Sequence, residues 1–492
     1  MSTSSKFYQP RHPEDSPFFK VLEANFDTFE LNYPALYQSK HGFWRPVIRK
    51  SLEKFMRCGD LREGFAIVRC KDCGDEKFVA FSCKQRSCCP SCDKKRSIIL
   101  GRRLTTEIIQ PVAHRQWVFT IPKRLRIYYR MDRRLLGRLS RCAYETMREL
   151  FRSETANDTV LPGMFSAIQS FGDLLNFHPH IHSIVTEGAY TEDDKFIPRP
   201  YVNLRVALTI WEDKVCDMML REEKISQEVV NQIRNQKHSG FSIDNSVRIP
   251  AGDNDGIHRL AEYIARSPLS LARMISVDPD GSVVYRASNK SCIPYPLMGD
   301  ETFKTGVKRN FQAFKPLDFL AEVTQHIPNK GEHQIRFYGR YSNKGRGYRQ
   351  KLADKQEEIN RLLDIRHRVE EIKIRSKFKL YWAAMIRLVF EVDPLQCQKC
   401  GGEMKIVGFI DSEAKARDIL ISSGLCRDRK TRPPPKALSP PQKPVKYPLL
   451  KEPPKAEDFG DFTCGEYIEP VPDYETCDMV SPSNHEVAEW TE

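Results

Sequence analysis

Residues 174–185 read LLNFHPHIHSIV and hold three of the twelve histidines of this 492-residue chain. The run HIHSIV, around residues 180–185, is predicted to be a strand, in which alternate side chains share a face. His180 and His182 are therefore expected to point the same way, while Ile181 faces the core. Two imidazoles at this spacing can bind one divalent cation and leave its other positions open, which suits a Lewis acid acting on a phosphoryl oxygen. A cluster of packing or surface histidines is the alternative.

The third ligand of such a cation is not fixed by spacing. Two histidines rarely suffice, so a further polar ligand is expected, and the candidates are Gln169, Gln116 and Glu187. His178 is another alternative, because Pro179 distorts the strand beside it and allows His178 to replace one of the pair.

Seven of the fifteen cysteines fall in the stretch RCGDLREGFAIVRCKDCGDEKFVAFSCKQRSCCPSCDKKR, residues 57–96. Two Cys-x-x-Cys pairs separated by fifteen residues match the spacing of a four-thiolate zinc site. Such a site has no open coordination position, so this zinc is predicted to be structural, and reduced core cysteines are the alternative. The predicted ligands are Cys70, Cys73, Cys89 and Cys92. Three spare thiols remain as substitute ligands or as part of a second site: Cys58, Cys83 and Cys88.

A further Cys-x-x-Cys pair, Cys397 and Cys400, lies in DPLQCQKCGGEMKIVGFI and resembles half of a zinc ribbon. The other half is not evident from the sequence, because Cys426 is within reach but is a single cysteine. Zinc binding and free thiols are therefore both open for this pair.

In GIHRLAEYIARS, residues 256–267, apolar residues recur with the i, i+3, i+4, i+7 spacing of an amphipathic helix. Tyr263 lies at the edge of this stripe, and Arg259 and Arg266 are adjacent to it on the helix surface. A phenol between two guanidinium groups is suited to meeting a phosphate as a nucleophile. On spacing alone, a boundary tyrosine with a packed ring and a hydrated hydroxyl is the favoured interpretation.

Two other tyrosines, Tyr338 and Tyr341, lie among basic residues in RFYGRYSNKGRGYRQK, residues 336–351. This segment is predicted to form a strand and a loop that contact backbone phosphates. The residues expected to contact DNA are Arg259, Arg266, Arg340, Lys344 and Arg346.

The composition favours a folded, basic chain of more than one domain, because 492 residues exceed one ordinary core and 40% of them are hydrophobic. Neither a membrane span nor a secretory signal is expected, since no apolar run approaches roughly 18 residues. The formal net charge of +13 includes an acidic stretch, residues 456–492, which leaves residues 1–455 at +24. Such a body suits a polyanion, most simply nucleic acid, with solubility as the alternative.

The C-terminal part has a different composition from the body. Nine of the 22 residues from Pro433 to Pro454 are proline, which suits an extended linker, and the acidic stretch beyond has too few aliphatic residues for a core. The expected parts are an N-terminal arm (1–50), a zinc-binding domain (51–105), a domain with the histidines and Tyr263 (106–365), a zinc-ribbon-like segment (366–430) and a disordered tail (431–492).

Taken in order, several blocks resemble rolling-circle insertion-sequence transposases with an N-terminal transposase zinc-binding domain, a branch of the HUH (histidine–hydrophobic–histidine) endonucleases. The resemblance covers roughly residues 45–425 and implies an α+β fold, in which an antiparallel sheet carries the histidine pair and a helix brings the tyrosine over it. It also implies an N-terminal zinc-binding module and a C-terminal zinc-ribbon-like segment. The blocks are RCKDCG…FSCKQRSCCPSC, RQWVFTIP, FGDLLNFHPHIHSIV, HRLAEYIARSPLS, IRFYGRYSNKGRG and EVDPLQCQKCGGEMKIVGFI.

By the same resemblance, His180 and His182 bind a catalytic Mg²⁺ or Mn²⁺, and Tyr263 forms a 5′-phosphotyrosine with single-stranded or hairpin DNA. Some members use two tyrosines a helical turn apart, whereas here that position is Arg259. A second strand transfer would then need a second subunit, another tyrosine or a water, so a homo-oligomer stays open. A bacterial cytosolic or nucleoid location is expected. The alternatives are a plasmid-type replication initiator or relaxase, and a non-enzymatic zinc DNA-binding protein.

Overall fold

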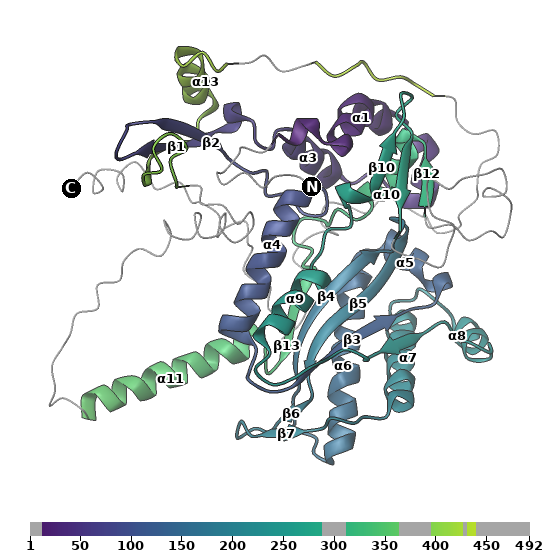
Figure 1. Ribbon diagram of the computed structural model, residues 1–492. Helices are drawn as coiled ribbons and strands as arrows, with labels where there is room; N and C mark the ends of the chain where they lie inside the picture. The colour runs from purple at the N-terminus through teal and green to yellow at the C-terminus, as the bar shows by residue number, and fades with distance from the viewer. Residues whose placement is uncertain (1–11, 288–310, 364–394, 427–430, 439–492) are drawn as a thin grey trace.

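The computed structural model describes residues 12–287, 311–363, 395–426 and 431–438 (Figure 1). These residues form a mixture of helices and antiparallel strands, which confirms the α+β prediction. Among them, no helix is both long and apolar enough to cross a membrane.

The largest sheet carries the histidine strand at its centre. Its strand order is β13-β4-β5-β3-β8, with β9 also paired to β3, and every neighbouring pair is antiparallel. The strand predicted from HIHSIV is confirmed as part of β5. The strands of this central sheet are β3 (His114–Thr120), β4 (Gly163–Phe171), β5 (Phe177–Thr186), β8 (Ser242–Asp244), β9 (Arg248–Ile249) and β13 (Ile335–Gly339).

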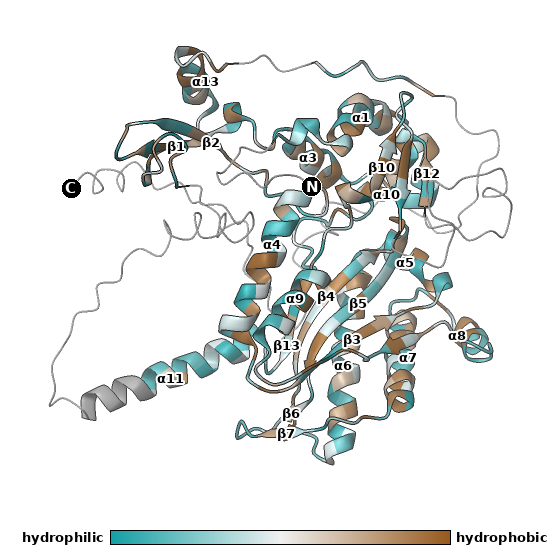
Figure 2. Ribbon diagram, in the orientation of Figure 1, coloured by the Kyte–Doolittle hydropathy of each residue, from teal (hydrophilic) through white to brown (hydrophobic). Residues whose placement is uncertain are grey.

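Helices cover both faces of the central sheet (Figure 1). One face packs on α6 (Arg134–Thr155) and α7 (Leu204–Arg221) through a core that includes Ile181. The other face packs on α4 (Pro90–Arg103) and α9 (Asn254–Ile264) through a core that includes Ile184. Figure 2 shows the hydrophobic residues of these central strands in brown. Because side chains alternate along β5, the even-numbered histidines lie on the face of Ile184, towards α9.

A second core joins segments that are distant in sequence, which we call the N-terminal unit. It includes Phe18 and Phe55 from the first helices, together with Tyr285 and Phe319. The range expected for an N-terminal arm therefore packs against residues from the range expected for the histidine-bearing domain. The elements of this unit are α1 (Pro17–Leu36), α2 (Gln38–His41), α3 (Pro46–Met56), β10 (Met274–Val277), β11 (Val283–Arg286), β12 (Phe311–Phe314) and α10 (Pro316–Thr324).

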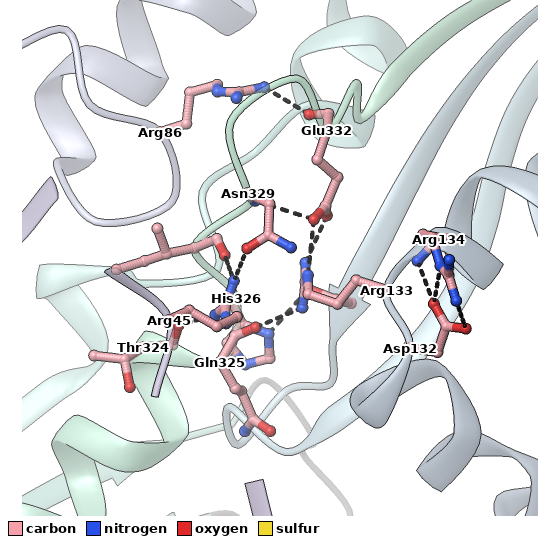
Figure 3. A network of polar contacts seen from close by, with 12 residues as sticks. Arg45, Arg86, Asp132, Arg133, Arg134, Thr324, Gln325, His326, Asn329 and Glu332 are labelled. Carbon is pink, nitrogen blue, oxygen red and sulfur yellow. Dashed lines mark hydrogen bonds and ion pairs between the residues drawn. The ribbon is translucent and has the colours of Figure 1, made fainter. Parts of the chain in front are cut away.

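A buried ion pair joins the N-terminal unit to the central sheet (Figure 3). Arg133, just before α6, donates to both carboxylate oxygens of Glu332 at 2.6 and 2.8 Å, and both side chains are 6% exposed. Arg133 also donates to the carbonyl of Gln325, while Arg45 donates to Asn329 in the same segment. Burial acts to raise the pKa of Glu332, but Arg133, the amide of Asn329 and Arg45 together hold that pKa below its usual value.

A separate three-stranded sheet is formed by strands from both ends of the folded chain. Its order is β14-β1-β2, and β14 pairs antiparallel with β1 so that Met404 lies opposite Cys70 and Ile410 opposite Phe65. The predicted ribbon-like segment is therefore not a module of its own, because it completes a sheet that begins some 330 residues earlier. The elements are β1 (Phe65–Cys70), β2 (Glu76–Ala80), β14 (Met404–Ile410) and α13 (Glu413–Ser422).

Several of the remaining elements complete the core on the α6 face of the central sheet, which includes Tyr129 of α5, Ala189 of β6 and Val230 of α8. The helix α11 projects from the body after β13 (Figure 1). The bounds of the remaining elements are α5 (Arg126–Met131), β6 (Gly188–Tyr190), β7 (Phe196–Pro198), α8 (Gln227–Arg234) and α11 (Asn343–Leu363).

Only the first residues of the expected tail, 431–438, are among those described, and they form neither helix nor strand. They lie against α1, where the side chain of Asn32 donates to the carbonyl of Lys436 and accepts from the amide of Leu438, each at 2.7 Å. The expectation for residues 439–492 concerns residues outside the described ones.

Candidate active site

His180 and His182 lie side by side on β5, as the alternation of a strand predicts. Their Nε2 atoms are 3.1 Å apart. Two ligands on adjacent positions of an octahedral ion with bonds of ~2.1 Å are about 3.0 Å apart, so this pair fits one small divalent cation.

Both imidazoles have a hydrogen-bond partner on the other ring nitrogen. Nδ1 of His180 lies 2.7 Å from the carbonyl oxygen of His178, which can only accept, so Nδ1 carries the proton and Nε2 a lone pair. As placed, the Nε2 of Gln116 lies 3.0 Å from Nδ1 of His182 and donates to it, but the amide can also be oriented with its oxygen towards this nitrogen. With the amide oxygen turned to accept, His182 takes the same tautomer, and two lone pairs then face the position of one cation.

Burial keeps these histidines uncharged. It lowers the pKa of His180 to about 4, and it lowers that of His182 to about 3, with a further contribution from the neighbouring His180 and Arg266. Both side chains are therefore neutral at pH 7, which is the form that binds metal.

The structure separates the candidates for a third ligand. Gln169 lies opposite His180 in the β4–β5 register and is 3% exposed. Its amide nitrogen donates to the carbonyl of Ile264, whereas its Oε1 has no hydrogen-bond partner among the described residues. A buried, unpartnered oxygen on the face of His180 fits a metal ligand.

The other candidates have different environments. Gln116 is engaged with His182, and Glu187 forms ion pairs with Arg115 and Arg248 at 2.9 and 2.8 Å. His178 stays a candidate, because its ring lies 5.0 Å from that of His180 and its buried Nε2 has no hydrogen-bond partner within the described part of the chain.

Tyr263 lies over the histidine pair. The helix α9 begins at Asn254, where Asp253 caps it by accepting from the amide of Gly256, and it ends before Pro268. The ring of Tyr263 is 5.9 Å from that of His182 and perpendicular to it. Tyr263 is nevertheless 46% exposed, so its hydroxyl is accessible to a large ligand.

A basic groove of about 580 Å³ runs past Tyr263. The guanidinium of Arg266 lies 4.7 Å from the centre of the Tyr263 ring, and Arg259 lines the same groove, as the helix spacing predicts. The sequence did not indicate that α4 and the segment after α9 also line it, with Lys94 and Arg273. Lys94 pairs with Glu262, which also lines the groove, and Arg273 pairs with Asp173. Arg259 and Arg266, beside an exposed phenol, are the cations that suit a phosphate backbone.

Tyr338 and Tyr341, by contrast, are buried. The Tyr341 hydroxyl is 2.7 Å from Nε2 of His114, and the Tyr338 hydroxyl is 3.0 Å from the hydroxyl of Ser140. Both are at most 1% exposed, so neither hydroxyl can meet DNA without rearrangement of the sheet.

The basic residues near these tyrosines also have partners within the chain. Arg340 pairs with Asp194 at 2.5 Å, and Arg346 donates to the carbonyl of Tyr341. Lys344 is exposed on α11. Of the basic residues expected to contact DNA, the structure thus brings Arg259 and Arg266 to Tyr263 and leaves the other three away from it.

The cysteines form two clusters, and this corrects the predicted grouping. Cys70 and Cys73 do not meet Cys89 and Cys92. The inner cluster is Cys58, Cys83, Cys89 and Cys92, and the outer cluster is Cys70, Cys73, Cys397 and Cys400. Within each cluster, all four sulfurs lie within 4.8 Å of one another.

The geometry of both clusters fits zinc. The closest sulfur pairs are 3.6 Å apart in the inner cluster and 3.5 and 3.6 Å apart in the outer one. Four thiolates around a tetrahedral zinc with bonds of about 2.3 Å are separated by about 3.8 Å. Cys426 is exposed and belongs to neither cluster, and Cys88 is buried beside the inner one.

The predicted grouping was wrong because spacing along the chain does not show which strands pair. Cys70 ends β1 and Cys73 lies just after it. Pairing of β14 with β1 brings Cys397 and Cys400, which precede β14, to this end of β1. The spare thiols Cys58 and Cys83 then complete the inner cluster, as one alternative for them allowed.

The chain matches two family models. Residues 28–121 match the model described as "Transposase zinc-binding domain", and residues 163–347 match the model described as "Putative transposase". The first range holds the seven cysteines of the N-terminal stretch, and the second holds His180, His182 and Tyr263.

Two curated proteins are similar over most of their length. The "Transposase for insertion sequence element IS801" of Pseudomonas savastanoi pv. phaseolicola is 25% identical over 400 residues, which are 76% of this chain and 87% of that protein. The "Putative transposase y4qJ" of Sinorhizobium fredii (strain NBRC 101917 / NGR234) is 22% identical over 344 residues, which are 65% of this chain and 80% of that protein. No solved structure matches the chain. The blocks of sequence, the antiparallel sheet, the cysteine clusters and these matches agree, and the chain is similar to transposases of insertion sequences and to the transposase zinc-binding domain.

Proposed function

We propose that this protein nicks single-stranded DNA and transfers the strand by the rolling-circle mechanism of the HUH endonucleases. The observation that carries the proposal is the position of Tyr263, an exposed phenol whose ring contacts His182 of a paired, uncharged histidine site. The basic groove past Tyr263 supports a DNA substrate, either single-stranded or a hairpin end of the mobile element.

His180, His182 and the Oε1 of Gln169 would hold a Mg²⁺ or Mn²⁺ ion. The amide oxygen is the kind of donor that these ions prefer, and the imidazoles add two neutral nitrogen donors. When bound, such an ion polarises the scissile phosphate and neutralises charge that develops on it. Gln116 and the carbonyl of His178 orient the two imidazoles, so the protein has little left to reorganise during the reaction.

The phenol oxygen of Tyr263 attacks phosphorus, and the bond from phosphorus to the 3′ oxygen breaks. The phenol proton passes to water, and the 3′ oxygen takes up a proton to leave as a hydroxyl. Arg266, beside the Tyr263 ring, supplies positive charge next to the phosphate. The 5′-phosphotyrosine preserves the energy of the broken bond, so a later 3′-hydroxyl can displace Tyr263 without ATP.

The match to a zinc-binding domain and the two cysteine clusters support structural zinc at both. A second strand transfer needs a second nucleophile, and the position one turn before Tyr263 is Arg259. We propose that a second copy of the chain supplies it, and that the protein acts in the bacterial cytosol or nucleoid.

Incubation of labelled single-stranded element ends with the purified protein and Mn²⁺ tests this function. We expect a covalent protein–DNA band that needs the divalent ion. His180→Ala and His182→Ala should each abolish the band and leave DNA binding largely intact, since affinity comes from many basic contacts. Binding without any band, in wild-type protein with intact ends, would instead support a non-enzymatic DNA-binding protein.

A further inference from the structure

The inner cysteine cluster lies at the start of the helix that packs along α9. Cys89 is the residue immediately before α4, and Cys92 lies in its first turn. The other two thiols come from the segment after α3 and from the segment after β2. A zinc ion at this cluster would therefore fix the N-terminal end of α4.

The helix α4 lies side by side with α9, which carries Tyr263 (Figure 1). Leu100 and Ala261 share the core on this face of the central sheet. Lys94 on α4 forms an ion pair at 2.8 Å with Glu262, the residue before Tyr263. The position of α4 is thus linked to that of the tyrosine by both apolar and polar contacts.

Gly101 of α4 lies close to His258 of α9. A Cβ atom built on Gly101 would lie 2.9 Å from Cδ2 and 3.2 Å from Cγ of His258. Rotation about the Cβ–Cγ bond of His258 does not move Cγ, so relief of this contact requires rotation of the imidazole about Cα–Cβ or a shift of one helix. Glycine in a helix interior is less stable than alanine, and here its small size allows the backbone of α4 to contact the imidazole.

We infer that the zinc-binding module is a part of the cleavage site, in which the contact between Gly101 and His258 sets the position of Tyr263 relative to His180 and His182. The inference rests on the proposed function. With zinc bound, the inner cluster would fix the position of α4. Packing of α9 on α4 would then fix the distance from the Tyr263 hydroxyl to the phosphate. Gly101 and His258 are positioning residues, since neither is in contact with the histidine pair.

Gly101→Ala tests this inference. We expect cleavage to slow by about 10- to 100-fold, because small displacements of a nucleophile are costly. Zinc content and DNA binding should stay as in the wild type. The amides of α9, residues 254–264, should exchange hydrogen faster, which is a readout independent of cleavage. If Gly101 served only the fold of α4, alanine would leave both measurements unchanged or make the helix more stable.

The second variant, Gly101→Ala with His258→Ala, removes the ring that the new methyl group meets. We expect it to recover most of the cleavage rate and the slow exchange of α9. Gly347→Ala is the matched control, since Gly347 is exposed in α11 and its added Cβ would meet nothing within 4 Å.

Two results would overturn the inference: Gly101→Ala that cleaves like the wild type, or a loss that the second replacement does not repair. Failure of the proposed function looks different, because wild-type protein would then form no covalent band at all.

Discussion

At the scale of the residue, the central feature is a pair of uncharged imidazoles, each with a hydrogen-bond partner at Nδ1. Alternation along one strand predicted that His180 and His182 share a face, and the structure confirms it. The spacing of residues along the chain did not distinguish the candidates for a third ligand, because it does not determine which residues of neighbouring strands lie opposite each other. Pairing of β4 with β5 places Gln169 opposite His180, whereas Gln116, on β3, reaches the far side of His182.

Gln116→Leu should weaken metal binding and keep the fold. Leucine has a similar size but makes no hydrogen bond to Nδ1 of His182, so the imidazole loses its fixed orientation. We expect the Mn²⁺ concentration at half-maximal cleavage to rise by about 10- to 100-fold. Direct titration of Mn²⁺ by calorimetry should show the same weakening. The exposed Gln232 provides the matched control, and equal effects of Gln116→Leu and Gln232→Leu would exclude the positioning role.

Tyr263 shows the limit of arguments from helix spacing. Spacing alone favoured a boundary tyrosine, and only the resemblance to a family singled it out among the 18 tyrosines. The structure supplies the missing observation, since Tyr263 contacts His182 while Tyr338 and Tyr341 are buried. Burial of those two is a tertiary property, because it depends on what packs over β13.

At the scale of the element, the clusters show how strand pairing decides which cysteines meet. The sequence identified six of the eight cluster residues as zinc ligands, with the pair Cys397 and Cys400 left open, but it joined the wrong pairs. The outer cluster forms only when β14 pairs with β1. No local sequence pattern near Cys70 indicates a partner more than 300 residues away. Each structural zinc contributes on the order of 10 kcal/mol to folding, so this long-range pairing is strongly stabilised.

Metal analysis should find two zinc ions per chain. Replacing Cys397 and Cys400 together by serine should remove one ion, and replacing Cys89 and Cys92 together should remove the other. The first change should largely preserve cleavage, because the outer cluster lies in the sheet of β1, β2 and β14 and shares no helix with α9. The second should impair cleavage through α4.

The grouping itself has a separate test. Replacing Cys70 and Cys89 together should cost both ions if the clusters are distinct. Loss of a single ion from that variant, measured by mass spectrometry of metals, would restore one site shared by the two N-terminal pairs.

At the scale of the whole molecule, the chain is held together by contacts between segments far apart in sequence. The N-terminal unit combines α1 and α3 with the strands β10, β11 and β12 and the helix α10. The ion pair of Arg133 and Glu332 joins this unit to the central sheet. Composition and block order predicted the α+β class and the basic body, but not these crossings, since burial of an ion pair depends on the final packing.

Arg133→Met should destabilise the protein by about 3–5 kcal/mol, because it leaves the buried carboxylate of Glu332 without its partner. Replacing both residues by methionine should cost less than the single change, since no charge is then stranded. Chemical denaturation gives both values. Lys195→Met, which breaks the exposed pair with Asp193, is the control and should change little. A double variant that is less stable than Arg133→Met would contradict this account of the junction.

The central claim is that Tyr263 is the nucleophile, and peptide mapping of the trapped protein–DNA adduct tests it most directly. Trypsin cleaves after Arg259 and Arg266, so the account predicts DNA on the peptide of residues 260–266. Tyr263→Phe, which keeps the ring and its contact with His182, should keep the fold and the zinc content and form no adduct. DNA attached to a peptide that contains Tyr338 or Tyr341, or an adduct that persists in Tyr263→Phe, would contradict the account.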